Sequence, residues 1–359
     1  MINWWNTSLG EEEKEELLLA FSERRITMSS SVQEAERLFA EMLQVPYAVM
    51  TNSGSSALLI SLLSLGLDRD VEVITPAITW IATPQAPALL GHNVKICDSL
   101  PDAPIIDTDH LEELVTDKTK VIMPVHLNGR YCDMQKIKEI ASRVGAFVIE
   151  DACKALFSKR GDSYLGTLGD VGCFSLGMIS PVSVGYGGLL VTHDKNIYER
   201  AKKIRDHGVR REPEAYEFLG FNFKISDLLA SLALPQLRNM ELKKKKFLTI
   251  HDYYCDNIFH PNMGILPIDK KKGSLPIYVE AVSEEREAIV DALSAKDIHV
   301  SRYHLPTFNA SYLNPTGSFP NAEKLAKKCF ILPSGPSQKM EDISRVVETI
   351  NSIELLAKV

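Results

Sequence analysis

Short apolar strands alternate with helices through the first two thirds of the chain, and this alternation constrains the fold more than any other feature. Each apolar run of three to five residues is followed by a turn and then by apolar residues at helical spacing. The strands predicted in this way cover 47–51, 72–75, 94–97, 121–125, 147–149, 173–176 and 189–191. Such alternation is typical of a mainly parallel sheet covered by helices on both faces. We therefore expect an α/β fold whose ligands bind at the carboxyl ends of the strands.

The pattern changes beyond Lys224. The sequence is helical through about Phe247, and a smaller α+β unit follows, with strands predicted at 277–282 and 298–303 and helices at 284–296 and 340–356. We place the boundary near Lys245. The predicted domains are a large α/β domain with an N-terminal helical segment, 1–245, and a small C-terminal α+β domain, 246–359.

Composition and charge exclude several classes of protein. The 359 residues include 40 Lys+Arg and 47 Asp+Glu, so the net charge of −7 argues against nucleic acids and anionic membranes as partners. The six cysteines show no C-x-x-C spacing, so we expect reduced thiols and no metal site. Neither a signal peptide nor a membrane-spanning run is apparent. These features favour a soluble, cytoplasmic protein.

Small hydroxyl side chains follow two of the strands. The turn 52–56 precedes a helix, and it offers the hydroxyls of Ser55 and Ser56 beside the positive end of the helix dipole. The turn could bind a phosphate or could be an ordinary serine N-cap. Ser175, at another strand end, could supply a further phosphate hydroxyl.

A carboxylate and an indole also lie near strand ends. Asp151 follows the apolar strand 147–149, where it could pair with a protonated ring nitrogen or could cap a turn or join a salt bridge. Trp80 follows the strand that ends at Pro76. Its indole could lie on a heteroaromatic ring or could belong to the core.

Ordered motifs along nearly the whole chain point to one family. They read N-S-G-S-S-A-L at 52–58, P-A-I-T-W-I-A-T at 76–83, T-K-V-I-M-P-V-H-L-N-G at 119–129, E-D-A at 150–152 and L-G-F-N-F-K at 219–224. In this order they resemble the DegT/StrS family of nucleotide-sugar aminotransferases, fold-type-I enzymes that depend on pyridoxal 5′-phosphate (PLP). The resemblance implies that Ser55, Ser56 and Ser175 hold the cofactor phosphate, that Trp80 stacks on the pyridine ring, that Asp151 pairs with the pyridine nitrogen, and that Asn222 reaches the phosphate of the other subunit in a homodimer.

The resemblance fails at the most important position. The family pattern F-S-F-x-x-T-K-x-x-x-x-G-E-G-G carries the Schiff-base lysine, whereas 174–188 reads F-S-L-G-M-I-S-P-V-S-V-G-Y-G-G, with Ser180 in the place of that lysine. No lysine lies between Arg160 and Lys195, so a shifted alignment cannot restore it. A serine hydroxyl forms no imine and is a poor base near neutral pH. We therefore expect ordinary transamination to be lost.

A second substitution lies close by in the pattern. Lys154 stands where the family has a glutamine that contacts the phenolic oxygen of the cofactor. Three functions remain open. The chain could be an enzyme that holds PLP or pyridoxamine 5′-phosphate (PMP) non-covalently, for example in a sugar dehydration, with Lys154 or His304 as base. It could be an inactive paralogue that binds the cofactor or a nucleotide sugar, or a transaminase in which Lys154 forms the Schiff base.

Overall fold

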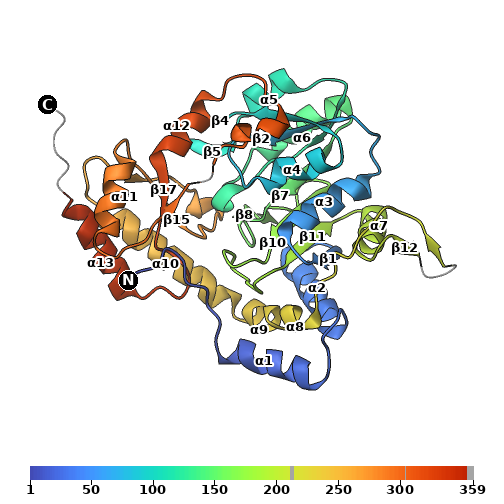
Figure 1. The fold of residues 1–359 in the computed structure, drawn as a ribbon, viewed down its shortest axis with the longest axis horizontal. Helices are drawn as coiled ribbons and strands as arrows, with labels where there is room; N and C mark the ends of the chain where they lie inside the picture. The colour runs from blue at the N-terminus through green and yellow to red at the C-terminus, as the bar shows by residue number, and fades with distance from the viewer. Residues whose placement is uncertain (211–213, 304, 354–359) are drawn as a thin grey trace.

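The computed structural model describes residues 1–210, 214–303 and 305–353. A large sheet with helices on both faces occupies one side of the molecule, and a smaller sheet with its own helices lies beside it (Figure 1). None of the helices in these ranges combines the length and apolar character that crossing a membrane would require.

The large sheet has seven strands. Their order is β1 (Tyr47–Thr51), β11 (Gly188–Thr192), β10 (Val171–Ser175), β7 (Phe147–Asp151), β6 (Thr119–Ile122), β2 (Glu72–Pro76) and β3 (Asn93–Cys97). The pairs from β10 to β3 are parallel, and β11 is antiparallel to both of its neighbours. The predicted mainly parallel sheet is confirmed. Strand β7 extends two residues beyond its predicted end and therefore includes Asp151.

Alternate residues of each strand face opposite layers of helices, as the pleat of a strand requires. Val73 and Val121 pack under α3 (Gly54–Leu65) and α7 (Lys195–Arg205), and α4 (Ala82–Leu89) joins this layer. Their chain neighbours Ile74 and Ile122 pack on the other face under α5 (Thr108–Leu114) and α6 (Met134–Val144). This two-sided burial explains why the strands read as uninterrupted apolar runs.

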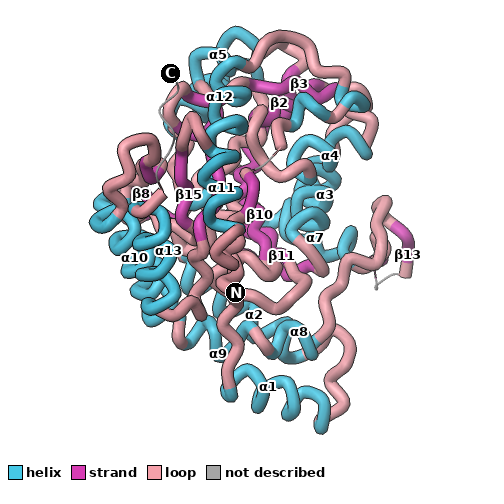
Figure 2. The backbone as a smooth tube through the Cα atoms, turned by 60° about the vertical axis from the view of Figure 1, so that its left-hand side comes forward, coloured by secondary structure: helices cyan, strands magenta, loops and turns pink. Residues whose placement is uncertain are grey.

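The helical stretch after Lys224 is divided into three helices where one was expected. These are α8 (Asp227–Ser231), α9 (Ala233–Arg238) and α10 (Met240–Asn257). Pro235 lies in the first turn of α9, where its missing N–H is tolerated, so the helix restarts just before it. The boundary near Lys245 falls inside α10 and remains a prediction. Helix α1 (Glu11–Ser22) packs across α8 and α9 (Figure 2).

The smaller sheet is antiparallel, in the order β14 (Gly264–Ile265), β15 (Val279–Val282), β17 (Cys329–Leu332) and β16 (Ser301–Arg302). Side chains of α10, α11 (Arg286–Ser294) and α13 (Met340–Asn351) form its core. The expected strand 298–303 is shorter than predicted, and the predicted end of the last helix, 354–356, lies outside the described residues. The remaining elements are α2 (Ser30–Leu43), α12 (Pro320–Lys328) and the pairs β4–β5 (Ser99–Leu100, Ala103–Ile106), β8–β9 (Lys159–Arg160, Ser163–Tyr164) and β12–β13 (Val209–Arg210, Ala215–Tyr216).

Candidate active site

The predicted phosphate hydroxyls lie in the first turn of helix α3. The helix starts at Gly54, three residues earlier than expected, so Ser55 and Ser56 belong to the helix itself. Ser53 is the N-cap, and its Oγ accepts a hydrogen bond from the N–H of Ser56 at 3.1 Å. Ser53 is therefore the serine N-cap that the sequence allowed as an alternative to a phosphate site. Ser55 remains exposed at the positive end of the helix.

Gly54 brings this helix end against two strand ends. An ideal Cβ at Gly54 would lie 3.0 Å from Sγ of Cys153 and 3.1 Å from Cβ of Ser175, tighter than most real Cβ contacts. The absence of a side chain thus lets α3 approach the ends of β7 and β10. Since Cys173 of β10 is in register with Asp151 of β7, the predicted serines and the carboxylate share one edge of the sheet.

The carboxylate of Asp151 is buried and fixed in orientation. Its Oδ2 accepts a hydrogen bond of 2.6 Å from Oγ1 of Thr83, which lies 2.9 Å from Oγ1 of Thr79. Its Oδ1 accepts the N–H of Cys153 at 3.0 Å. Asp151 is 3% exposed, and in the described part of the chain no cation forms an ion pair with it. A buried carboxylate without a cation suits a protonated ring nitrogen.

The adjacent Glu150 points into different surroundings. Its Oε2 accepts the N–H of Gly166 at 2.9 Å and lies 2.7 Å from Nε2 of His126. Burial lowers the pKa of His126, but nearby Cys132 and Glu150 outweigh this and raise it. Glu150 thus binds groups inside the protein, and Asp151 alone of the two carboxylates is suited to the cofactor.

Trp80 lies on the surface and not in the core. Its side chain is 64% exposed, and it directly precedes the residue that caps α4. A large exposed indole near the strand ends fits the stacking role better than the alternative of a core residue.

Ser180 is buried, and its hydroxyl is committed to the backbone. The residue is 2% exposed, and its Oγ donates a hydrogen bond of 2.8 Å to the carbonyl of Ser175. The neighbouring carbonyl of Met178 accepts hydrogen bonds from Nε1 of Trp5 at 2.9 Å and from Oγ1 of Thr7 at 3.2 Å. The hydrogen bond from Ser180 therefore closes a turn whose backbone is also fixed by the hydrogen bonds from Trp5 and Thr7.

Lys154 reaches the same segment from the end of β7. Its Nζ donates a hydrogen bond of 2.7 Å to the carbonyl of Ile179, the residue before Ser180. Burial lowers the pKa of the Lys154 amine, and the nearby Cys153 and Asp151 oppose this shift. The amine therefore lies next to residue 180, the position predicted to correspond to the family lysine.

Asn222 precedes Phe223, whose carbonyl accepts a hydrogen bond of 2.9 Å from the N–H of Asn52 in the serine turn. Asn222 is exposed and forms an isolated antiparallel β-bridge with Asp206. The side chain of Asp206 also forms an ion pair with Lys224. The side chains of Leu219 and Phe221 beside it are 85% and 70% exposed. His304, the other suggested base, lies outside the described residues.

Sequence reasoning assigned no role to several supporting residues. Thr79 and Thr83 orient Asp151, and their spacing of four residues within P-A-I-T-W-I-A-T was the available signal. Trp5, Thr7 and Gln236 hold the segment around Ser180, and no local pattern indicated them.

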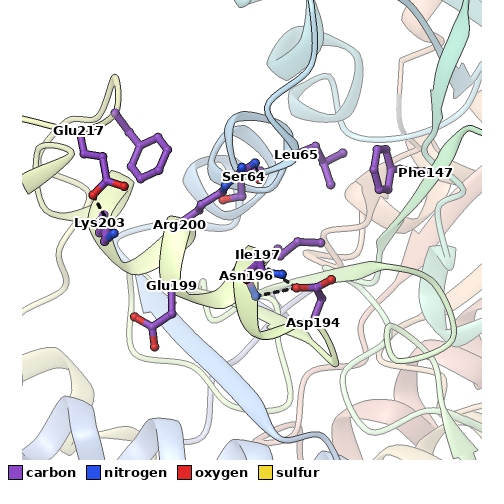
Figure 3. A pocket seen from close by; sticks show the side chains of 11 residues that line it. Ser64, Leu65, Phe147, Asp194, Asn196, Ile197, Glu199, Arg200, Lys203 and Glu217 are labelled. Carbon is purple, nitrogen blue, oxygen red and sulfur yellow. Dashed lines mark hydrogen bonds and ion pairs between the residues drawn. The ribbon is translucent and has the colours of Figure 1, made fainter. Parts of the chain in front are cut away.

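A separate surface pocket of about 460 Å³ lies between α3 and α7 (Figure 3). Ser64 and Leu65 contribute from the C-terminal end of α3, the opposite end from Ser55. Its lysine, Lys203, is paired with Glu217 at 2.8 Å. None of the predicted site residues lines this pocket.

Comparison with known proteins agrees with this arrangement. The family model for the DegT/DnrJ/EryC1/StrS aminotransferase family matches residues 7–351. The chain is 32% identical over 327 residues to GDP-perosamine synthase of Escherichia coli O157:H7, which covers 89% of each protein. It is 27% identical over 370 residues to the spore coat polysaccharide biosynthesis protein SpsC of Bacillus subtilis, covering 96% of this chain and 95% of that protein.

Solved structures give the same fold. The aminotransferase TlmJ from Streptoalloteichus hindustanus superposes with a TM-score of 0.94 at 25% identity, covering 98% of both chains. The GDP-4-keto-6-deoxy-D-mannose-3-dehydratase of E. coli, solved with bound hydrated PLP, gives 0.90 at 23% identity and covers 98% of this chain and 99% of that one. The fold is that of the fold-type-I PLP-dependent transferases, and the chain belongs to the DegT/DnrJ/EryC1/StrS aminotransferase family.

Proposed function

We propose that this chain modifies a nucleotide-linked keto sugar with PLP or PMP held non-covalently, in a dehydration and not in an ordinary transamination. The observation that carries the proposal is the state of Ser180, which stands at the Schiff-base position with its hydroxyl buried and bonded to the carbonyl of Ser175. Similarity to GDP-perosamine synthase and the fold shared with a 3-dehydratase support the substrate class.

The residues present fit such a cofactor. Ser55, Ser56 and Ser175 would hold the phosphate at the helix N-terminus, and Trp80 would lie on the ring. Asp151 is buried, forms no ion pair with any of the described residues, and is oriented by Thr83, as pairing with a ring nitrogen requires. When bound, the group supplies an electron sink for bonds broken at the substrate. The chain itself binds and orients it.

We expect Asp151→Asn to weaken binding of PLP and PMP by roughly 10- to 100-fold, because a charge-assisted hydrogen bond contributes about 1.5–3 kcal/mol. Isothermal titration calorimetry measures the affinities. A matched control is Asp170→Asn, on the loop before β10, whose carboxylate accepts the N–H of Val148. Equal binding by the wild type and Asp151→Asn would assign the carboxylate another role.

The chain is expected to be a homodimer in which Asn222 of one subunit reaches the phosphate site of the other. The exposed apolar side chains of Leu219 and Phe221, close to Asn222 in the chain, support the proposal that a partner subunit covers this surface. Analytical ultracentrifugation at micromolar concentration should give twice the mass of one chain. A single-chain mass would contradict the dimer.

The reaction itself is tested by incubating the PMP-loaded protein with a panel of nucleotide-linked 4-keto sugars and analysing the products by mass spectrometry. Dehydration predicts loss of a hydroxyl from the sugar, whereas transamination predicts a product in which nitrogen replaces the keto oxygen. Cofactor binding without any turnover would favour the inactive paralogue.

A cytoplasmic location belongs to the same proposal, supported by six cysteines that are all free thiols.

A further inference from the structure

We infer that Lys154 is the proton-transfer residue of this active site and provides the amine that position 180 lacks. The inference rests on the proposed function and deepens it, because non-covalent binding explains how the cofactor is held but not which group moves the proton. Lys154 supplies such a group from a neighbouring strand.

The position of the amine is the first argument. Lys154 lies three residues beyond Asp151, and its Nζ is 2.7 Å from the carbonyl oxygen of Ile179. The amine is therefore next to residue 180 although the two residues belong to different segments. The hydrogen bond to Ile179 uses one of the three donors of an ammonium group.

The surrounding groups are the second argument. Between Phe174 and Gly185 the sequence contains no ionisable side chain, and the hydroxyl of Ser180 is bonded to Ser175. Burial raises the pKa of the Cys153 thiol well above its usual value, so that group stays protonated. Among residues 147–155 and 174–185, Lys154 is the one that carries an amine.

The charge balance is the third argument. Burial lowers the pKa of Lys154, while the nearby carboxylate of Asp151 opposes this shift. A lysine whose pKa lies closer to neutrality exchanges a proton more readily.

In a dehydration the neutral amine accepts a proton from carbon, and the C–H electron pair forms the new double bond. The resulting ammonium then donates its proton to a hydroxyl group on a conjugated carbon. The C–O bond breaks, and the hydroxyl leaves as water together with the C–O electron pair.

The alternative is that Lys154 serves as a structural link to Ile179 alone. The test is competitive labelling of the cofactor-free protein with acetic anhydride over a pH series, with each lysine quantified by mass spectrometry. Lys154 should be labelled at a lower pH than Lys327, whose side chain is 77% exposed. When PLP is present at ten times its dissociation constant, only about a tenth of the sites are free. Labelling of Lys154 should therefore slow roughly tenfold.

Lys243 is the matched control. Burial lowers its pKa to about 8, and its Nζ bonds to Oε1 of Gln236 at 2.7 Å and to the carbonyl of Pro181 at 3.4 Å. It is thus a second amine that contacts the same segment, but it reaches it from α10, and its charged neighbour is Glu13 of α1 and not Asp151. Lys243 should also be labelled at lower pH than Lys327, but PLP should leave its rate unchanged.

The outcomes separate this inference from the proposed function. If calorimetry detects binding of neither PLP nor PMP, the proposed function fails. If PLP binds but Lys154 is labelled at the same pH as Lys327, or is protected no more than Lys243, the inference fails alone. A borohydride-stable adduct on Lys154 would also overturn it, since the amine would then act covalently.

A variant adds a readout that a structural link would not give. Lys154→Gln carries the residue usual in the family and should keep PLP binding. We expect turnover to fall about 10²- to 10⁴-fold, as for loss of a general acid–base group, and the limb of the pH–rate profile due to the amine to disappear. An unchanged pH profile in a folded Lys154→Gln protein would contradict proton transfer by this residue.

Discussion

Ser180→Lys is expected to convert a protein that forms no covalent adduct with PLP into one that carries about one adduct per chain. Residue 180 aligns with the family lysine, and Asp151, Trp80 and the serines of the expected cofactor site are present. An amine at this position would face the site, and burial there would lower its pKa and favour imine formation. The measurement is borohydride reduction followed by peptide mapping.

The space for the longer side chain is limited. A Cβ at Gly185 would meet nothing within 4 Å, but at Gly187 and Gly188 it would meet Val184 at 2.8 Å and the carbonyl of Ser53 at 2.2 Å. Gly187 and Gly188 are therefore closely packed, and their small size does not by itself provide space for the longer side chain. The substitution also loses the hydrogen bond from Ser180 to Ser175.

Two variants control this experiment. Ser180→Met introduces a side chain of similar length without an amine and should give no adduct. The double variant Ser180→Lys with Lys154→Gln restores both family residues and should form the adduct at residue 180. A Ser180→Lys protein that folds and binds PLP, but shows no adduct at residue 180, would mean that the turn does not face the cofactor.

Glu280→Ala is expected to lower the free energy of unfolding by about 3–5 kcal/mol, because it leaves a buried cation unpaired. Glu280 is 1% exposed on β15 and forms an ion pair with Arg130, which is 5% exposed and lies between β6 and α6. Its carboxylate also accepts hydrogen bonds from Nδ2 of Asn128 at 2.7 Å and from the hydroxyl of Tyr303 at 2.8 Å. The network joins the two sheets of the molecule.

Denaturant unfolding followed by fluorescence and circular dichroism measures this effect. The matched control is Glu284→Ala, a glutamate four residues on, whose side chain is 73% exposed in an ion pair with Lys328. Exposed pairs contribute about 0–1 kcal/mol, so the control should stay near the wild type. Similar losses for both variants would mean that the network around Arg130 does not stabilise the fold as a buried ion pair should.

The sequence determined those features that depend on neighbouring residues. Apolar runs and turns gave the strands of the large sheet, because burial on both faces of a sheet is visible in consecutive residues. The order of the motifs gave the family, and the segment 174–188 gave the absence of the lysine. The ends of helices were predicted less well than the strands. Helix α3 starts at Gly54, three residues earlier than expected, because Ser53 is its N-cap.

The tertiary structure decided which distant groups meet. Thr83 bonds to Asp151 across 68 residues, Lys154 to Ile179 across 25, and Trp5 to Met178 across 173. Lys154 starts at the end of a neighbouring strand, yet its amine reaches residue 179. Such contacts depend on strand order, side-chain direction and close packing, which no local periodicity encodes. The sequence thus predicted that position 180 lacks an amine, and the fold showed that the amine of Lys154 reaches the adjacent residue 179.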